Sequence, residues 1–130
     1  MCAELKKEFL HAFGPVKRTL KEYKFYIKDF EKEAAKLKKL EDEKADEGEI
    51  TRQKGSVEET EGAKKQTFKT LIKFLTPLKE ILSTIESEED NDQETAKAKA
   101  EIKELKEYKE VMGIIKEAEE FIAKDGATMN

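Results

Sequence analysis

Residues 16–37 carry large apolar side chains at alternating steps of four and three residues, and this spacing constrains the fold more than any other feature. Heptad spacing of this kind keeps one stripe of a helix facing a partner helix. The stripe consists of Val16, Leu20, Tyr23, Ile27, Phe30, Ala34 and Leu37. Because Pro15 suits the first turn of a helix, the spacing predicts a first long helix over residues 15–44, with Ile27 in the core.

A second helix is predicted over residues 50–85, after an acidic connection at 41–49. Its second half continues the spacing with Leu71, Leu75, Leu78, Leu82 and Ile85, so Leu75 is expected in the core. Gly55 and Gly62 each cost about 1 kcal/mol relative to alanine, which predicts a weak or kinked first half. Pro77 removes one helical hydrogen bond, which predicts a bend over 73–77.

A third helix is predicted over residues 95–123, after a second acidic connection at 86–94. Its expected inner face consists of Ala98, Ile102, Leu105, Tyr108, Met112, Ile115 and Ile122. Residues 124–130 are expected to form a frayed tail after a glycine stop. Residues 1–14 form an N-terminal extension, in which Phe9 and Phe13 prolong the first stripe and favour a short helix that folds against the main body.

The composition agrees with helices around a thin core, because 43% of the residues are charged and only 37% are hydrophobic. Full disorder is the competing interpretation, but helical spacing of apolar residues is not needed in a solvated chain. Each amphipathic helix needs a partner, and connections of this length allow antiparallel neighbours. The predicted fold is therefore all-α: an elongated antiparallel three-helix bundle, coiled-coil-like and rod-shaped.

Charge and hydropathy exclude several classes of partner. The net charge of −4, with both signs interspersed, lacks the basic excess of a nucleic-acid-binding domain. No segment approaches the length of a membrane span, and the N-terminus lacks the apolar region of a signal peptide. The lone Cys2 cannot form an internal disulfide. We therefore expect a soluble, cytoplasmic protein that binds neither nucleic acid nor membrane.

Residues suited to catalysis or metal binding are scarce. His11 is the only histidine, so neither a serine–histidine–aspartate arrangement nor an ordinary zinc site can be assembled. Carboxylates paired at i,i+3, such as Glu58 with Glu61 and Glu101 with Glu104, lack the histidines of a di-metal site and are best explained as solvated faces. We expect no enzymatic activity, no metal and no cofactor.

The stretch from Pro15 to Phe30 alternates basic and large apolar residues. Its cations include Lys17, Arg18 and Lys21, which fall away from the inward stripe and are free to contact an acidic partner. A charged outer face that only keeps a bundle soluble explains the same pattern. A basic amphipathic helix on a lipid surface is a further alternative, but two other apolar stripes in the chain favour burial within the protein.

Two apolar residues of the second helix, Phe74 and Ile81, lie one heptad apart beside its stripe. If they stay exposed, they are candidates for the apolar anchor of an interface. Periodicity alone favours the other interpretation, a widened buried face.

Residues Val16, Lys17, Arg18, Lys21, Glu22 and Tyr26 match a V-K-R-x-x-K-E-x-x-x-Y segment, and with it the sequence resembles the tubulin-binding cofactor A family. The resemblance continues through Ile50, Gln53, the "LKEIL" of the second helix and the "EYKE" at 107–110, over residues 14–120. It implies a small helical chaperone that captures β-tubulin after its release from the cytosolic chaperonin and holds it before pairing with α-tubulin.

The family resemblance also implies a cytoskeleton-associated protein that uses no nucleotide of its own. Other tubulin-folding cofactors and a second copy of the chain remain open as partners. The runner-up interpretation is a generic helical-bundle module for protein interaction, such as an adaptor, which the periodicity fits equally well.

Overall fold

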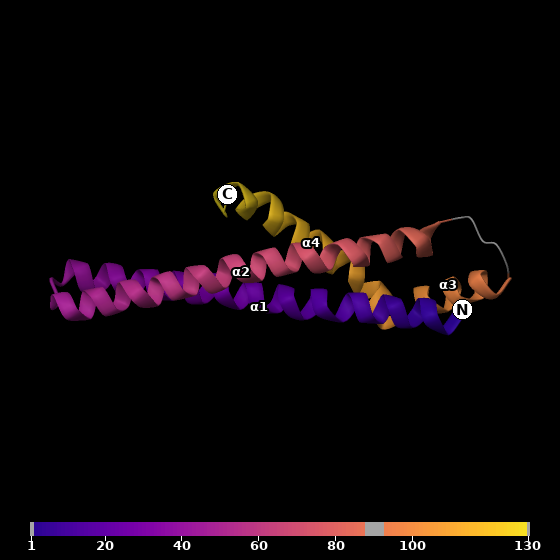
Figure 1. Ribbon diagram of the computed structural model, residues 1–130, viewed down its shortest axis with the longest axis horizontal. Helices are drawn as coiled ribbons and strands as arrows, with labels where there is room; N and C mark the ends of the chain where they lie inside the picture. Colours follow the sequence, from indigo (N-terminus) through magenta and orange to yellow (C-terminus); the bar gives the residue numbers. More distant parts are fainter. Residues whose placement is uncertain (1, 88–92, 130) are drawn as a thin grey trace. The chain divides into compact units, whose positions relative to one another are not determined.

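The computed structural model describes residues 2–87 and 93–129, and all regular structure in these ranges is helical (Figure 1). The chain order is α1 (Cys2–Asp42), α2 (Glu47–Glu86), α3 (Gln93–Lys103) and α4 (Lys106–Met129). The prediction of an all-α protein is confirmed. The prediction of one helix over 95–123 is wrong, because two helices occupy that part of the chain.

The chain divides into two compact units. Unit 1 consists of residues 1–20 and 70–130, and unit 2 consists of residues 21–69. Both α1 and α2 therefore contribute one part to each unit. In the description below, each unit is treated by itself.

The core of unit 1 joins the start of α1 to the second half of α2 and to α3 and α4. Its fully buried side chains include Phe9, Val16, Leu71, Leu78, Ile85, Ile102 and Val111. Leu75 is also buried there, which confirms its predicted place in the core. The ring of Phe9 stacks on Phe13 at 5.9 Å and contacts Tyr108 at 6.0 Å.

The packing of Phe9 and Phe13 explains why α1 begins at Cys2 and not near Pro15. A proline inside a helix costs about 3 kcal/mol, because it removes a hydrogen bond and crowds the preceding turn. Burial of two phenylalanines against the core offsets a cost of this size, since each contributes roughly 1.5–3 kcal/mol. Residues 2–14 are thus part of a long helix through Pro15.

The connection between α1 and α2 spans only residues 43–46, shorter than the predicted 41–49. Lys44 has a φ of 56° and its N–H donates to the carbonyl of Glu41, while Ala45 N–H donates to that of Leu40. This is a Schellman motif built without glycine. The carboxylate of Asp46 then accepts from the N–H of Gly48 at 3.2 Å and caps α2, so Gly48 lies inside the helix.

Helix α2 is continuous through Gly55, Gly62 and Pro77, and it extends by one residue past the predicted end. The predicted second connection falls partly on residues 88–92, which lie outside the described residues. At the other end of the chain, α4 continues to Met129, so the frayed tail predicted after residue 123 is wrong. Gly126 does not end the helix, and no glycine in the described residues has a positive φ.

The break between α3 and α4 lies at Glu104 and Leu105, whose N–H groups donate to the carbonyls three residues back. Neither glycine nor proline marks this break in the sequence. In α4, Val111 and Ala118 are buried beside the predicted Ile115, while Met112 is 54% exposed. The predicted inward position of Met112 is therefore wrong.

Unit 2 is a helical hairpin of the second part of α1 and the first part of α2. The rings of Tyr23 and Phe68 are buried and meet at 5.7 Å between their centroids. Ile27 is only half-buried, contrary to its predicted place in the core. The facing part of α2 is largely polar: its buried residues are Gln53, Thr60 and Thr67 together with Phe68.

Candidate functional site

The predicted basic surface begins at Lys17, which already has partners in unit 1. Its ammonium lies 2.9 Å from Oε2 of Glu110 on α4 and 5.9 Å from the centre of the Phe13 ring. The hydrogen bond from Lys17, together with the charge of Lys106, lowers the pKa of the Glu110 carboxyl. Lys17 is therefore exposed, but part of its charge is already balanced within the protein.

Arg18 and Lys21 are both exposed on α1. Arg18 belongs to unit 1, and its guanidinium lies over Gly14, where a β-carbon would meet Nη1 at 3.6 Å. Lys21 belongs to unit 2 and has no ion pair or hydrogen bond within the described residues. The three predicted basic residues are thus exposed, but they differ in how far their charges are already balanced.

Phe74 and Ile81 are half-buried, and both pack against the core of unit 1. A large part of each side chain therefore already serves the fold. This placement favours the interpretation of a widened buried face over that of a free apolar anchor.

In the described part of the chain, three large apolar side chains other than these are exposed. Phe25 is 61% exposed, Met112 is 54% exposed and Ile72 is 40% exposed. Sequence reasoning did not single out Phe25, although it lies two residues from both Tyr23 and Ile27. Two residues correspond to about 200° of helical rotation, so the heptad spacing itself places Phe25 on the outer side.

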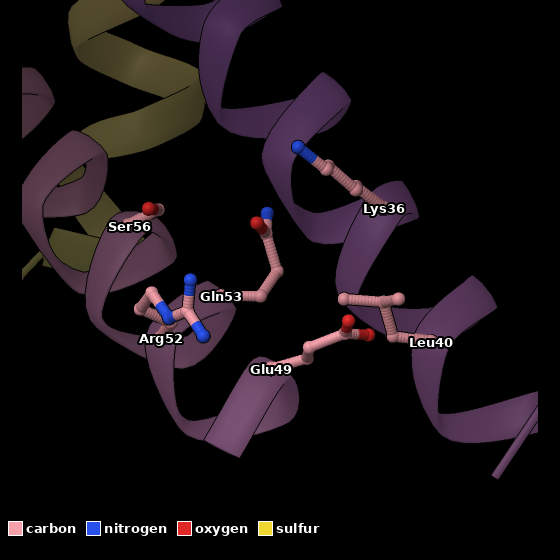
Figure 2. Close-up of a pocket in the computed structure, with 6 residues that line it drawn as sticks. All are labelled: Lys36, Leu40, Glu49, Arg52, Gln53 and Ser56. Atoms are coloured by element: carbon pink, nitrogen blue, oxygen red, sulfur yellow. The ribbon is translucent and has the colours of Figure 1, made fainter. Parts of the chain in front are cut away.

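A groove in unit 2 has a volume of ≈ 370 Å³ and lies between α1 and α2 close to their connection (Figure 2). Its lining residues are Lys36 and Leu40 from α1 and Glu49, Arg52, Gln53 and Ser56 from α2. The side chain of Gln53 extends from α2 toward α1 (Figure 2). There Nε2 donates to the backbone carbonyl of Glu33 at 2.9 Å and to Oε2 of Glu33 at 2.6 Å.

The groove residues are mostly polar or charged. Ser56 has no histidine among the lining residues that could act as its base. Lys36, Arg52 and Glu49 place both signs of charge around the opening, with Leu40 as the apolar contribution. Such a surface suits a polypeptide side chain better than a buried small molecule.

Near α3 and the end of α2, the hydroxyl of Tyr108 lies 3.4 Å from Oε1 of Glu86. Burial raises the pKa of Tyr108 above its ordinary value, and the neighbouring Glu86 carboxylate adds to the rise. Tyr108 therefore stays protonated at neutral pH and links α2 to α4.

Residues 2–87 and 93–129 contain no group of three or more His, Cys, Asp or Glu side chains placed to hold a metal ion. Within the same ranges, no helix has an apolar stretch of the length needed to cross a membrane.

A family model described as Tubulin binding cofactor A matches residues 6–102. The matched range includes all of unit 2, most of α1 and the whole of α2. No curated protein and no solved structure matches the chain.

Proposed function

Because this chain belongs to the tubulin binding cofactor A family, a family of chaperones that bind tubulin, we propose that its tubulin partner is β-tubulin. In this proposal it captures β-tubulin after release from the cytosolic chaperonin and holds it before pairing with α-tubulin. The single observation that carries the proposal is the family match over residues 6–102. The proposed location is the cytoplasm, in association with the cytoskeleton.

The proposed action is binding without catalysis, nucleotide or metal. It is supported by a surface that consists of helical faces with mixed charges and by a groove whose residues suit binding. Other tubulin-folding cofactors are further proposed partners, because a holding protein must pass its client on.

We assign the contact with β-tubulin to Lys17, Arg18 and Lys21 and to the exposed parts of Phe74 and Ile81. The basic residues are exposed and would favour association through electrostatic complementarity. Phe74 and Ile81 would add apolar area beside the core, with less area available than a fully exposed pair.

The test is a titration of purified β-tubulin with the parent and with the combined variant Lys17→Glu, Arg18→Glu and Lys21→Glu. The matched control reverses three other exposed lysines, Lys6, Lys7 and Lys73, and therefore changes the net charge equally. We expect the parent and the control to bind and the basic-surface variant to bind more weakly. Circular dichroism of all three proteins verifies that each is folded.

Two results would count against the proposal in different ways. Absence of binding by the folded parent would refute the β-tubulin assignment and leave the generic interaction module. Equal binding by the parent and the basic-surface variant would remove these three residues from the interface. Because Lys17→Glu also places two carboxylates together, the exchange Lys17→Glu with Glu110→Lys restores the ion pair and isolates its structural effect.

A further inference from the structure

The outer side of α1 in unit 2 carries a second four-three stripe. It consists of Lys21, Phe25, Lys28 and Lys32, and we call it the cationic stripe. Each member lies two residues before a member of the inward stripe, at about 200° of rotation around the helix. All four side chains are exposed. The stripe is therefore a continuous outer face about three turns long.

The three lysines of the cationic stripe have no ion pair or hydrogen bond within the described residues. Lys28 and Lys32 are four residues apart, and Lys36 follows at the same interval. Like charges at this spacing repel each other and weaken a helix. Lysines elsewhere do find carboxylates, as Lys65 does with Glu61 and Lys79 with Glu119. The stripe thus lines up three lysines that no carboxylate pairs with directly, while Glu22 and Asp29 lie beside it.

Phe25 lies in the middle of these cations and is the most exposed of the large apolar side chains in the described residues. Its ring meets the ring of Tyr26 edge-on at 5.5 Å, which restricts its orientation. A single exposed apolar residue is ordinary on a protein surface. An aromatic ring flanked by unpaired cations is instead the composition of an interface anchor with a polar rim.

We propose that the cationic stripe docks an acidic helical segment of a partner protein, with an apolar side chain of that segment seated on Phe25. Acidic residues three and four positions apart on a helix would face Lys21, Lys28 and Lys32 at matching intervals. The inference rests on the proposed function only for the identity of the partner: if the proposed function holds, the partner is β-tubulin.

Two features favour a polypeptide over a continuous polyanion. Glu22 and Asp29 lie on one flank of the same face and would repel the phosphates of a nucleic acid or an anionic lipid surface. Oδ2 of Asp29 lies 3.5 Å from the Thr60 hydroxyl, which also lies 3.0 Å from the carbonyl of Ser56. One phenylalanine is also too little apolar area to anchor a helix in a bilayer. Exposed Glu31 lies on the opposite flank. A short protein segment with discrete carboxylates can face the three lysines and avoid these acids.

The test compares β-tubulin binding by the parent, by Phe25→Ala and by the combined variant Lys21→Glu, Lys28→Glu and Lys32→Glu. A matched control reverses Lys38, Lys39 and Lys54, which are exposed lysines of the same unit. We expect each stripe variant to weaken binding by about tenfold or more, with the control near the parent. Binding of the parent should also weaken as salt rises, because exposed charges are screened.

A second probe separates this inference from the proposed function. It is a fluorescent helical peptide with glutamates three and four residues apart around one leucine. If the parent binds β-tubulin and the stripe variants bind it equally well, the inference is refuted and the proposed function stands. If the parent binds only the peptide, and Phe25→Ala abolishes this, the stripe docks another acidic protein. If neither probe binds, or if only phosphatidylserine vesicles bind, the inference is refuted.

Discussion

The side-chain amide of Gln53 on α2 donates both of its hydrogens to Glu33 on α1, one to the backbone carbonyl and one to the carboxylate. Gln53 is buried, so these hydrogen bonds replace the water that the amide loses on folding. Two further contacts join the helices along the hairpin. The hydroxyl of Thr60 lies near Asp29, and the ammonium of Lys64 lies over the Phe30 ring at 5.1 Å from its centre. Unit 2 is thus held together to a large extent by polar groups.

We expect Gln53→Ala to destabilise unit 2 by about 1–3 kcal/mol, because Glu33 loses a buried partner and the groove gains empty space. Amide hydrogen exchange should show faster opening of residues 21–69. The neighbouring exposed substitution Arg52→Ala serves as the control and should leave exchange nearly unchanged. Unaltered exchange in Gln53→Ala would show that the two hydrogen bonds do not stabilise the hairpin.

We expect Gly62→Ala to stabilise the protein by about 1 kcal/mol, because glycine is costly inside a helix. Apart from the neighbouring residues and the nearby backbone of the helix itself, no atom lies within 4 Å of the position that the added β-carbon would occupy, and the same holds at Gly55. Gly48→Ala is the control, because there the β-carbon would meet Oδ2 of Asp46 at 3.0 Å and disturb the cap. The midpoint of chemical denaturation should rise for Gly62→Ala and not for Gly48→Ala.

We expect Leu75→Asp to cost several kcal/mol and to unfold unit 1, because it buries an unpaired carboxylate in a core position. Thr76→Asp introduces the same charge at the adjacent exposed position and should be nearly neutral. Circular dichroism and thermal melting measure both effects. Equal melting of Leu75→Asp and the parent would contradict the assigned core.

We expect Lys17→Ala to raise the pKa of Glu110, because the hydrogen bond from Lys17 is the main cause of its lowered value. A carboxyl with a lowered folded pKa stabilises the protein above the unfolded pKa, and this contribution disappears as pH falls through the folded pKa. As pH falls from the unfolded to the folded pKa of Glu110, the parent should therefore lose more stability than Lys17→Ala. Nuclear magnetic resonance titration of the Glu110 carboxyl in both proteins, with Lys7→Ala as the control, measures the shift.

Several features of the molecule could be predicted from the sequence because they depend on local spacing and propensity. Heptad periodicity alone predicted helices throughout, the burial of Leu75 and the outward position of Lys17, Arg18 and Lys21. The groove-lining Gln53 was noticed in the sequence only as a position shared with the family. Its burial could not be predicted, because the pattern of apolar residues does not mark a polar residue that finds its partner across a hairpin.

The sequence by itself therefore determined the helical class, most of the inward residues and the family. Tertiary structure decided where helices begin and break. Burial of Phe9 and Phe13 carries α1 through Pro15, and α3 separates from α4 without a local signal, which leaves Met112 exposed. Local propensities are worth about 1 kcal/mol or less for most residues, whereas burial of one large side chain contributes more, so packing overrides them where the two conflict.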